Sequence, residues 1–298
     1  MSVVIALAGD TLRSCGRAWI LVGLVTVLAL AAATTVAVIA HVPAEYMKAA
    51  AGLVEQGAVP SLPGDTASDE RQTKAAVIQD LTASEYELVM KDTARAAGLR
   101  HVVGMGGALL AALIGVLVNE TRSGRIGPIV ARAIPRRTVV LGQMVGGACA
   151  LTMATALLAV ALMLADAAVV GRAEPRVLPA AGLILPNLMV CLTLVYALAT
   201  VMHPVGAAGV GLLVCAAVGQ IGAIYRSLTA AEVHGLVVDA TRLAYRLLPH
   251  LGDLKTAAED YLIEARVHIP IGPAIGTDAI YTLLLTLAAC WLFSRRQV

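Results

Sequence analysis

The most concentrated source of charged chemistry in this sequence is a short basic stretch. Residues 119–138 contain one acidic residue, Glu120, and five arginines: Arg122, Arg125, Arg132, Arg136 and Arg137. Guanidinium groups pair strongly with carboxylates and phosphates, so this stretch is suited to an acidic protein partner or to lipid headgroups. The simpler alternative is a basic loop that only anchors the topology of the chain.

The residue patterns that power transport or hold a metal are missing from this sequence. A phosphate-binding P-loop needs a lysine directly after a glycine, and none of Lys48, Lys74, Lys91 and Lys255 follows one. The six histidines include no pair at the His-x-x-x-His spacing of a zinc site, and the five cysteines include no Cys-x-x-Cys pair. We therefore expect no enzyme activity, no metal and no cofactor bound by this chain.

The composition predicts a membrane environment for the elements that carry these residues. Apolar residues make up 59% of the 298 residues and charged residues 14%, against about 45–50% and about 25% in soluble proteins. The mean hydropathy is +0.82. So few charges cannot cover a soluble domain, and so many apolar residues exclude a disordered chain. The chain is predicted to be an all-α integral membrane protein.

Charge-free runs predict six transmembrane helices, because about 20 apolar residues cross the hydrocarbon layer. These runs are residues 18–40, 102–118, 139–165, 177–202, 205–225 and 279–294. We expect the last span to extend backwards over Asp278 to residue 276, giving a span over 276–294. The first run is longer than the apolar core of a cleaved signal peptide. The interiors of the runs lack charge, which disfavours an ion-coupled carrier. Their mildly polar residues are expected to join helices to one another: Thr34, Thr35, Gln143, Thr152, Thr155, Asn187, Gln220 and Thr286.

The distribution of basic residues predicts the orientation. Short basic segments remain in the cytoplasm, which places residues 1–17, 119–138 and 295–298 there and residues 41–101 and 226–275 outside. We expect a multi-pass protein of a bacterial cell membrane with both termini cytoplasmic. The abundance of Ala and Val beside a single Phe favours a GC-rich bacterial genome.

Amphipathic patterns predict helices outside the spans. In residues 1–17, apolar residues recur at spacings of three and four, as in a helix lying in the membrane interface. Residues 232–248 carry a longer apolar stripe opposite Asp239, Arg242 and Arg246, and they predict an external helix. Residues 41–101 are too long for a simple connection, so we expect them to form an external helical cap.

The basic stretch also resembles a known sequence pattern. It is similar to the cytoplasmic loop between the second and third spans of type-2 permeases of ATP-binding-cassette exporters (ABC-2 permeases). Residues that fit this pattern are Glu120, Gly124, Ile126, Ile129, Val130, Arg136, Leu141 and Gly142. The sequence departs from it at Arg125, where Thr is usual, at Ala133, where many members have Pro, and at Gln143, where Lys is usual. The order of predicted helices along the whole chain is also similar to that family.

The resemblance implies a permease subunit that moves substrate outward when a separate ATPase subunit binds and hydrolyses ATP with Mg²⁺. It implies a second permease copy, as a homodimer or a related heterodimer, and no nucleic-acid partner. The coupling segment would contact the ATPase through ten residues: Glu120, Arg122, Gly124, Arg125, Ile126, Ile129, Val130, Arg132, Pro135 and Arg136. No residue pattern in the spans identifies the substrate. The alternatives are a secondary carrier without ATPase and a non-transporting membrane scaffold or sensor.

Overall fold

A computed structural model describes residues 2–17, 19–40, 83–118, 135–231, 235–263 and 270–295. Every regular element in these ranges is a helix. The helices are α1 (Ser2–Arg17), α2 (Trp19–Ala40), α5 (Ala83–Gly98), the π-helix η1 (Leu99–Gly106), α6 (Gly107–Val118), α8 (Arg136–Val170), α9 (Val177–Val201), α10 (Pro204–Ala230), α11 (Leu236–Leu247), α12 (Asp253–Leu262) and α13 (Ile271–Arg295). The all-helical prediction is confirmed for this part of the chain.

Within these ranges, five helices are long and apolar enough to cross a membrane. They are Leu88–Val118, Arg136–Val169, Val177–Val201, Pro204–Thr229 and Ile271–Arg295. The five long apolar helices indicate a membrane-spanning protein. Helix α2 (Trp19–Ala40) coincides with the first predicted run and is also apolar, but it is not one of these five, so the sixth span stays a prediction.

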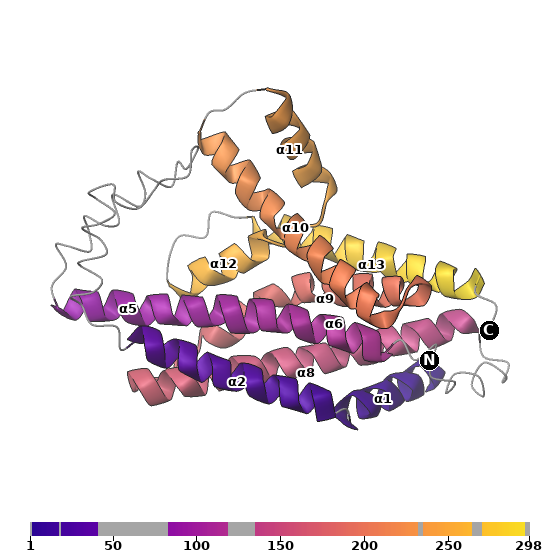
Figure 1. Cartoon of the computed structure of the whole chain (residues 1–298), viewed down its shortest axis with the longest axis horizontal. Coiled ribbons are helices and arrows are strands. Elements are labelled where there is room, and N and C mark those ends of the chain that lie inside the picture. The colour runs from indigo at the N-terminus through magenta and orange to yellow at the C-terminus, as the bar shows by residue number, and fades with distance from the viewer. Residues whose placement is uncertain are drawn as a thin grey trace.

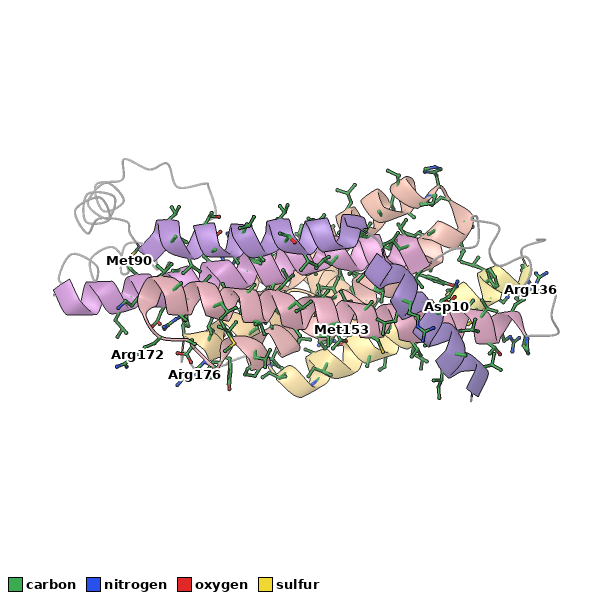
Figure 2. All side chains as sticks on the ribbon, turned by 90° about the horizontal axis from the view of Figure 1, so that it is seen from below. Asp10, Met90, Arg136, Met153, Arg172 and Arg176 are labelled. Atoms are coloured by element: carbon green, nitrogen blue, oxygen red, sulfur yellow. The ribbon has the colours of Figure 1, made fainter. Side chains whose placement is uncertain are left out.

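The helices form an elongated bundle with two distinct ends (Figures 1 and 2). The start of α1, the end of α13 and Arg136 lie at one end, here called the Arg136 end. Met90, Arg172 and Arg176 lie at the opposite end, called the Arg176 end. Helix α9 contacts α6, α8, α10, α12 and α13 and forms the centre of the bundle. Helix α10 begins against α9 and α6 and slants away from the bundle, with α11 folded back along it.

Helices α5, η1 and α6 follow one another without a break from Ala83 to Val118. At about 1.5 Å per residue this composite helix is roughly 50 Å long. The predicted boundary between an external segment and a span, at residue 101, therefore falls inside a continuous helix. The π-helical part is a wider turn of the kind often found at functional sites.

Helix α1 crosses the first half of α8 (Figure 2), and two glycines of α8 lie at the contact. A Cβ atom placed on Gly142 would lie 2.6 Å from the Leu7 Cβ, and one on Gly146 would lie 2.7 Å from the Thr11 Cβ and 2.8 Å from the Ala8 carbonyl oxygen. The absence of a side chain at these two positions thus allows close helix packing. The interfacial helix predicted for residues 1–17 corresponds to α1, which is helical from Ser2 to Arg17.

Substitution of Gly146 by valine is expected to separate α1 from α8. The new side chain would meet the backbone of α1, which cannot rotate away, and such overpacking costs about 1–3 kcal/mol. Cys15 on α1 is buried, so its labelling by a water-soluble maleimide, in a chain without other cysteines, should become several-fold faster. Gly9→Val is the matched control, because nothing lies within 4 Å of its Cβ position. Equal labelling rates in the two variants would contradict this packing.

The polar residues of the predicted spans differ in the partners of their hydrogen bonds. Tyr196 of α9 donates a hydrogen bond of 2.6 Å to the Gln143 side chain of α8, and the Asn187 amide donates to the Leu251 carbonyl oxygen before α12. The predicted role of joining separate elements is confirmed for Gln143 and Asn187. The hydroxyls of four threonines donate to carbonyl groups of their own helix: Thr34, Thr35, Thr152 and Thr286.

Candidate functional site

The predicted coupling segment lies mostly outside the described residues. Of its ten predicted contact residues, Pro135 and Arg136 are described; the other eight are not: Glu120, Arg122, Gly124, Arg125, Ile126, Ile129, Val130 and Arg132. The helices that flank the segment are described at both of its ends. Val118, the last residue of α6, lies against Gly147 of α8, since a Cβ on that glycine would be 3.3 Å from the valine side chain.

The start of α8 contacts the end of α13. Pro135 precedes the first helical turn, and its carbonyl oxygen accepts a hydrogen bond of 2.8 Å from the Thr138 amide. The Arg136 guanidinium donates to the Ser294 carbonyl oxygen at 3.4 Å. The next residue of α13, Arg295, stacks on Trp291, one turn earlier, with its guanidinium carbon 4.1 Å from the ring centre. The Arg136 end thus combines α1, α8 and α13 where the basic stretch joins α8.

At the Arg176 end, a buried ion pair joins α5 to α8. The Arg95 Nε atom lies 3.1 Å from each carboxylate oxygen of Asp166, whose side chain is fully buried. Arg95 also contacts Asp92 at 3.0 Å and Glu174 at 3.9 Å. The sequence placed Arg95 in an external cap and Asp166 at the edge of a loop. Their pairing explains why both charges are instead accommodated within long helices.

A second ion pair joins η1 to α12. Arg100 forms a two-pronged interaction with Glu259, using Nε at 2.9 Å and Nη2. Lys255, one helical turn before Glu259, lies against Gly104 of η1. Burial lowers the pKa of Lys255 below its usual value; the neighbouring Glu259 opposes this shift and Arg100 adds to it.

Helix α12 itself was missed in the sequence. Its buried face includes Leu254, Ala257, Ala258 and Leu262, at the three- and four-residue spacings of an amphipathic helix. That spacing was the signal available. The prediction of a helix over residues 232–248 also needs correction, because α11 begins only at Leu236, after Gly235 with φ of 134°. A positive φ of this kind favours glycine and interrupts a helix.

A third polar cluster connects α10, α11 and α12. Asp253, which is buried, pairs with Arg226 and accepts a hydrogen bond of 2.5 Å from the Tyr245 hydroxyl. Burial, followed by the hydrogen bond to Asp253, raises the pKa of Tyr245 above its usual value. The Tyr245 ring also stacks on Tyr225, with centres 4.8 Å apart. Gly222 leaves room for the ion pair, because a Cβ there would lie 2.7 Å from the Asp253 carboxylate.

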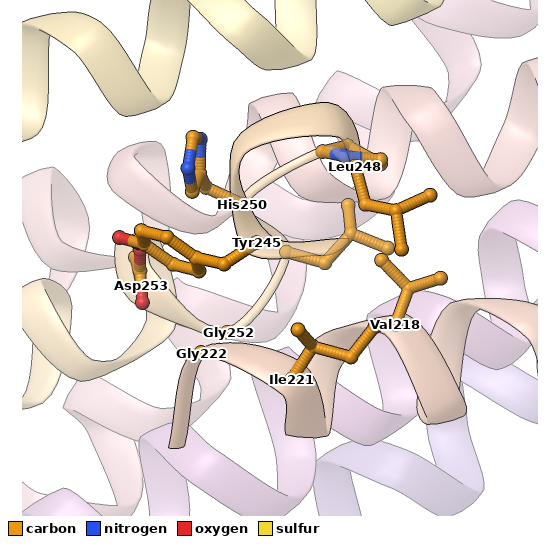
Figure 3. A pocket seen from close by; sticks show the side chains of 10 residues that line it. Val218, Ile221, Gly222, Tyr245, Leu248, His250, Gly252 and Asp253 are labelled. Carbon is orange, nitrogen blue, oxygen red and sulfur yellow. The ribbon is translucent and has the colours of Figure 1, made fainter. Parts of the chain in front are cut away.

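The turn between α11 and α12 extends this cluster to α13 (Figure 3). The His250 Nδ1 atom lies 2.7 Å from the Thr277 hydroxyl oxygen. That hydroxyl donates to the carbonyl oxygen of Pro273 or Ala274, each at 2.9 Å. The contact between His250 and Thr277 therefore joins the α11–α12 turn to α13.

The residue after Thr277 is the least expected one in the structure. Asp278 is fully buried in α13, and neither carboxylate oxygen has a hydrogen-bond partner among the described residues. The expectation that the span interiors carry no charged residue type is therefore wrong for α13. The sequence could have raised the question, because Asp278 is the one acidic residue in the predicted span from 276 to 294.

A small cavity and a larger groove lie between these helices. A cavity of about 10 Å³ lies between α10 and the α11–α12 turn, and His250, Tyr245 and Asp253 are among its lining residues (Figure 3). A larger groove of about 480 Å³ lies between α9 and α13. Its lining is almost wholly apolar: Gly182, Leu185, Pro186, Met189, Ile275, Ala279, Thr282, Leu283 and Thr286. This groove is suited to an apolar occupant.

The chemistry of the site follows from these contacts. Among the described residues, no group of three or more His, Cys, Asp or Glu side chains is arranged to hold a metal ion. The polar groups instead form ion pairs and hydrogen bonds between helices, concentrated around α12. Comparison with models of known protein families and with curated proteins gave no match. The five long apolar helices indicate a helical protein that spans a membrane.

Proposed function

We propose that this chain is the membrane-spanning permease subunit of an ABC-2 type exporter, in which a separate ATPase subunit supplies the energy. The observation that carries the proposal is the combination of the basic stretch 119–138 with the arrangement of the helices that flank it. Helices α6 and α8 are the two elements joined by this stretch, and α1 packs across α8 close to its start. The resemblance of the stretch to ABC-2 permeases supports the same function.

The proposed mechanism uses the composite helix α5–η1–α6 as a rigid lever. ATP-driven closure of the ATPase would displace the basic stretch and tilt α6 and α8, a rigid-body switch driven by ligand binding elsewhere. The composite helix continues from Val118 to the ion pairs of Arg95 and Arg100. A movement of this helix at Val118 would therefore strain its contacts with α8 and α12 near Arg95 and Arg100.

A cross-linking experiment tests the proposed partner. A photo-reactive residue at position 126 in the full chain, activated in native membranes, is expected to capture an ATP-binding-cassette ATPase. The same residue at position 236, an exposed site on α11, is the matched control and should capture none. If no nucleotide-hydrolysing protein is captured from position 126, the exporter proposal fails.

Reconstitution of that complex tests the coupling role. Substitution of Glu120 or Gly124 is expected to leave membrane insertion and ATP hydrolysis in place while transport is lost, because the force would no longer reach α6 and α8. The readouts are phosphate release and substrate movement in the same vesicles. Undiminished transport in both variants would contradict the coupling role of this stretch.

One observation favours a secondary carrier as the second candidate. Such carriers place ionisable residues inside their spans, and Asp278 is a fully buried carboxyl group in α13. In this case a proton gradient, without ATP, would drive transport by the reconstituted chain alone. Transport that requires ATP and the ATPase would exclude this candidate.

A further inference from the structure

Asp278 is a buried acid whose carboxyl oxygens accept no hydrogen bond from the described residues. Its side chain has no exposed surface, and both oxygens lack a hydrogen-bond partner in the described part of the chain. Burial of an isolated carboxylate is far more costly than burial of the neutral acid, so such a group takes up a proton instead. The groups around Asp278 therefore decide whether its carboxyl group is charged or neutral.

The charged groups around Asp278 do not offset the cost of burying a negative charge on its carboxyl group. The backbone amide of His250 lies near the carboxyl group, and Asp253 adds a second negative charge nearby. The cation of this cluster, Arg226, is already paired with Asp253. The other ionisable side chains on the elements packed against α13 are Cys191 and Tyr196 on α9, Lys255, Glu259, Asp260 and Tyr261 on α12, and Arg136, Arg137, Cys149 and Asp166 on α8.

We propose that Asp278 is a proton-binding site that holds the α11–α12 turn against α13. The neutral carboxyl group permits the close approach of His250 and Asp253, which the bond between His250 and Thr277 maintains. Loss of the proton breaks the O–H bond of the acid, transfers the proton to water and leaves an anion facing Asp253. The turn then separates from α13. This inference does not depend on the proposed function, since it concerns the chain alone.

The direct test uses the intact wild-type protein labelled with ¹³C at aspartate side-chain carboxyl groups. One carboxyl resonance is expected to show the chemical shift of a protonated acid at neutral pH, and Asp278→Asn should remove that resonance. Asp239→Asn, at an exposed position of α11, is the matched control and should leave it. If every aspartate of the wild-type protein is ionised at neutral pH, or the protonated resonance survives in Asp278→Asn, the proposal is overturned.

A stability measurement adds a second readout. The folded state would hold a proton that the unfolded chain releases, so unfolding releases a proton and stability falls as pH rises. For one proton, the unfolding equilibrium constant rises up to tenfold per pH unit in the range where Asp278 stays protonated only in the folded state. Asp278→Asn should remove this dependence. The same slope in wild type and Asp278→Asn would assign the pH dependence to another group and overturn the proposal.

Discussion

Replacement of Asp166 by alanine is expected to destabilise the protein by about 3 kcal/mol, within the range measured when one partner of a buried ion pair is removed. Asp166 is fully buried and accepts a bifurcated hydrogen bond from the Arg95 Nε–H, which lies 3.1 Å from each carboxylate oxygen, and the Arg95 side chain is only 12% exposed. Alanine would leave the guanidinium buried with weaker partners, Asp92 and Glu174. The measurement is the free energy of unfolding in mixed micelles titrated with a denaturing detergent.

Two further variants separate the buried pair from ordinary charge effects. Asp239→Ala removes one partner of an exposed pair with Arg242, and it should change stability by less than about 1 kcal/mol. The double variant Arg95→Leu/Asp166→Leu should recover much of the loss, because neither member is then left as an unpaired buried charge. Equal, small effects of Asp166→Ala and Asp239→Ala would contradict the buried contact between α5 and α8.

Replacement of Tyr196 by alanine is expected to cost about 3–5 kcal/mol, as for other large aromatic residues removed from a packed core. Tyr196 is fully buried on α9, the central helix. The change would leave a cavity between α8 and α9 and remove the donor for Gln143. The same detergent titration measures this loss.

Tyr196→Phe isolates the hydrogen bond from the packing. It keeps the ring but leaves the Gln143 oxygen without its 2.6 Å donor, which should cost about 1–3 kcal/mol. Restoring stability in Tyr196→Phe by Gln143→Leu would confirm that the loss comes from the unpaired amide. If Tyr196→Ala were no more destabilising than Tyr196→Phe, the ring would not contribute the packing described here.

The ends of α8 illustrate how far charge alone predicts a helix. The sequence predicted a span over residues 139–165, bounded by the nearest charges. The observed helix runs from Arg136 to Val170, because Arg95 pairs with Asp166 and the helix can continue past that charge. It ends at Gly171, whose left-handed conformation, with φ of 80°, terminates helices.

The site around α12 shows what charge patterns miss. Asp278 was counted as part of the last predicted span, but its complete burial depends on the α11–α12 turn that covers it. Lys255 and Glu259 were assigned to the external segment 226–275, and the structure places them on a helix packed against η1 and α9. The predicted contact residues of the basic stretch remain predictions, apart from the placement of Pro135 and Arg136.

The sequence by itself determined that this chain forms long apolar helices, because hydropathy and the spacing of charges are local properties. It also located the basic stretch between two of them. Only the tertiary structure decided which charges are neutralised, because Arg95 and Asp166 are 71 residues apart and Arg100 and Glu259 are 159 apart. Partners so distant in sequence leave no periodic pattern, and they meet only when the helices that carry them pack together.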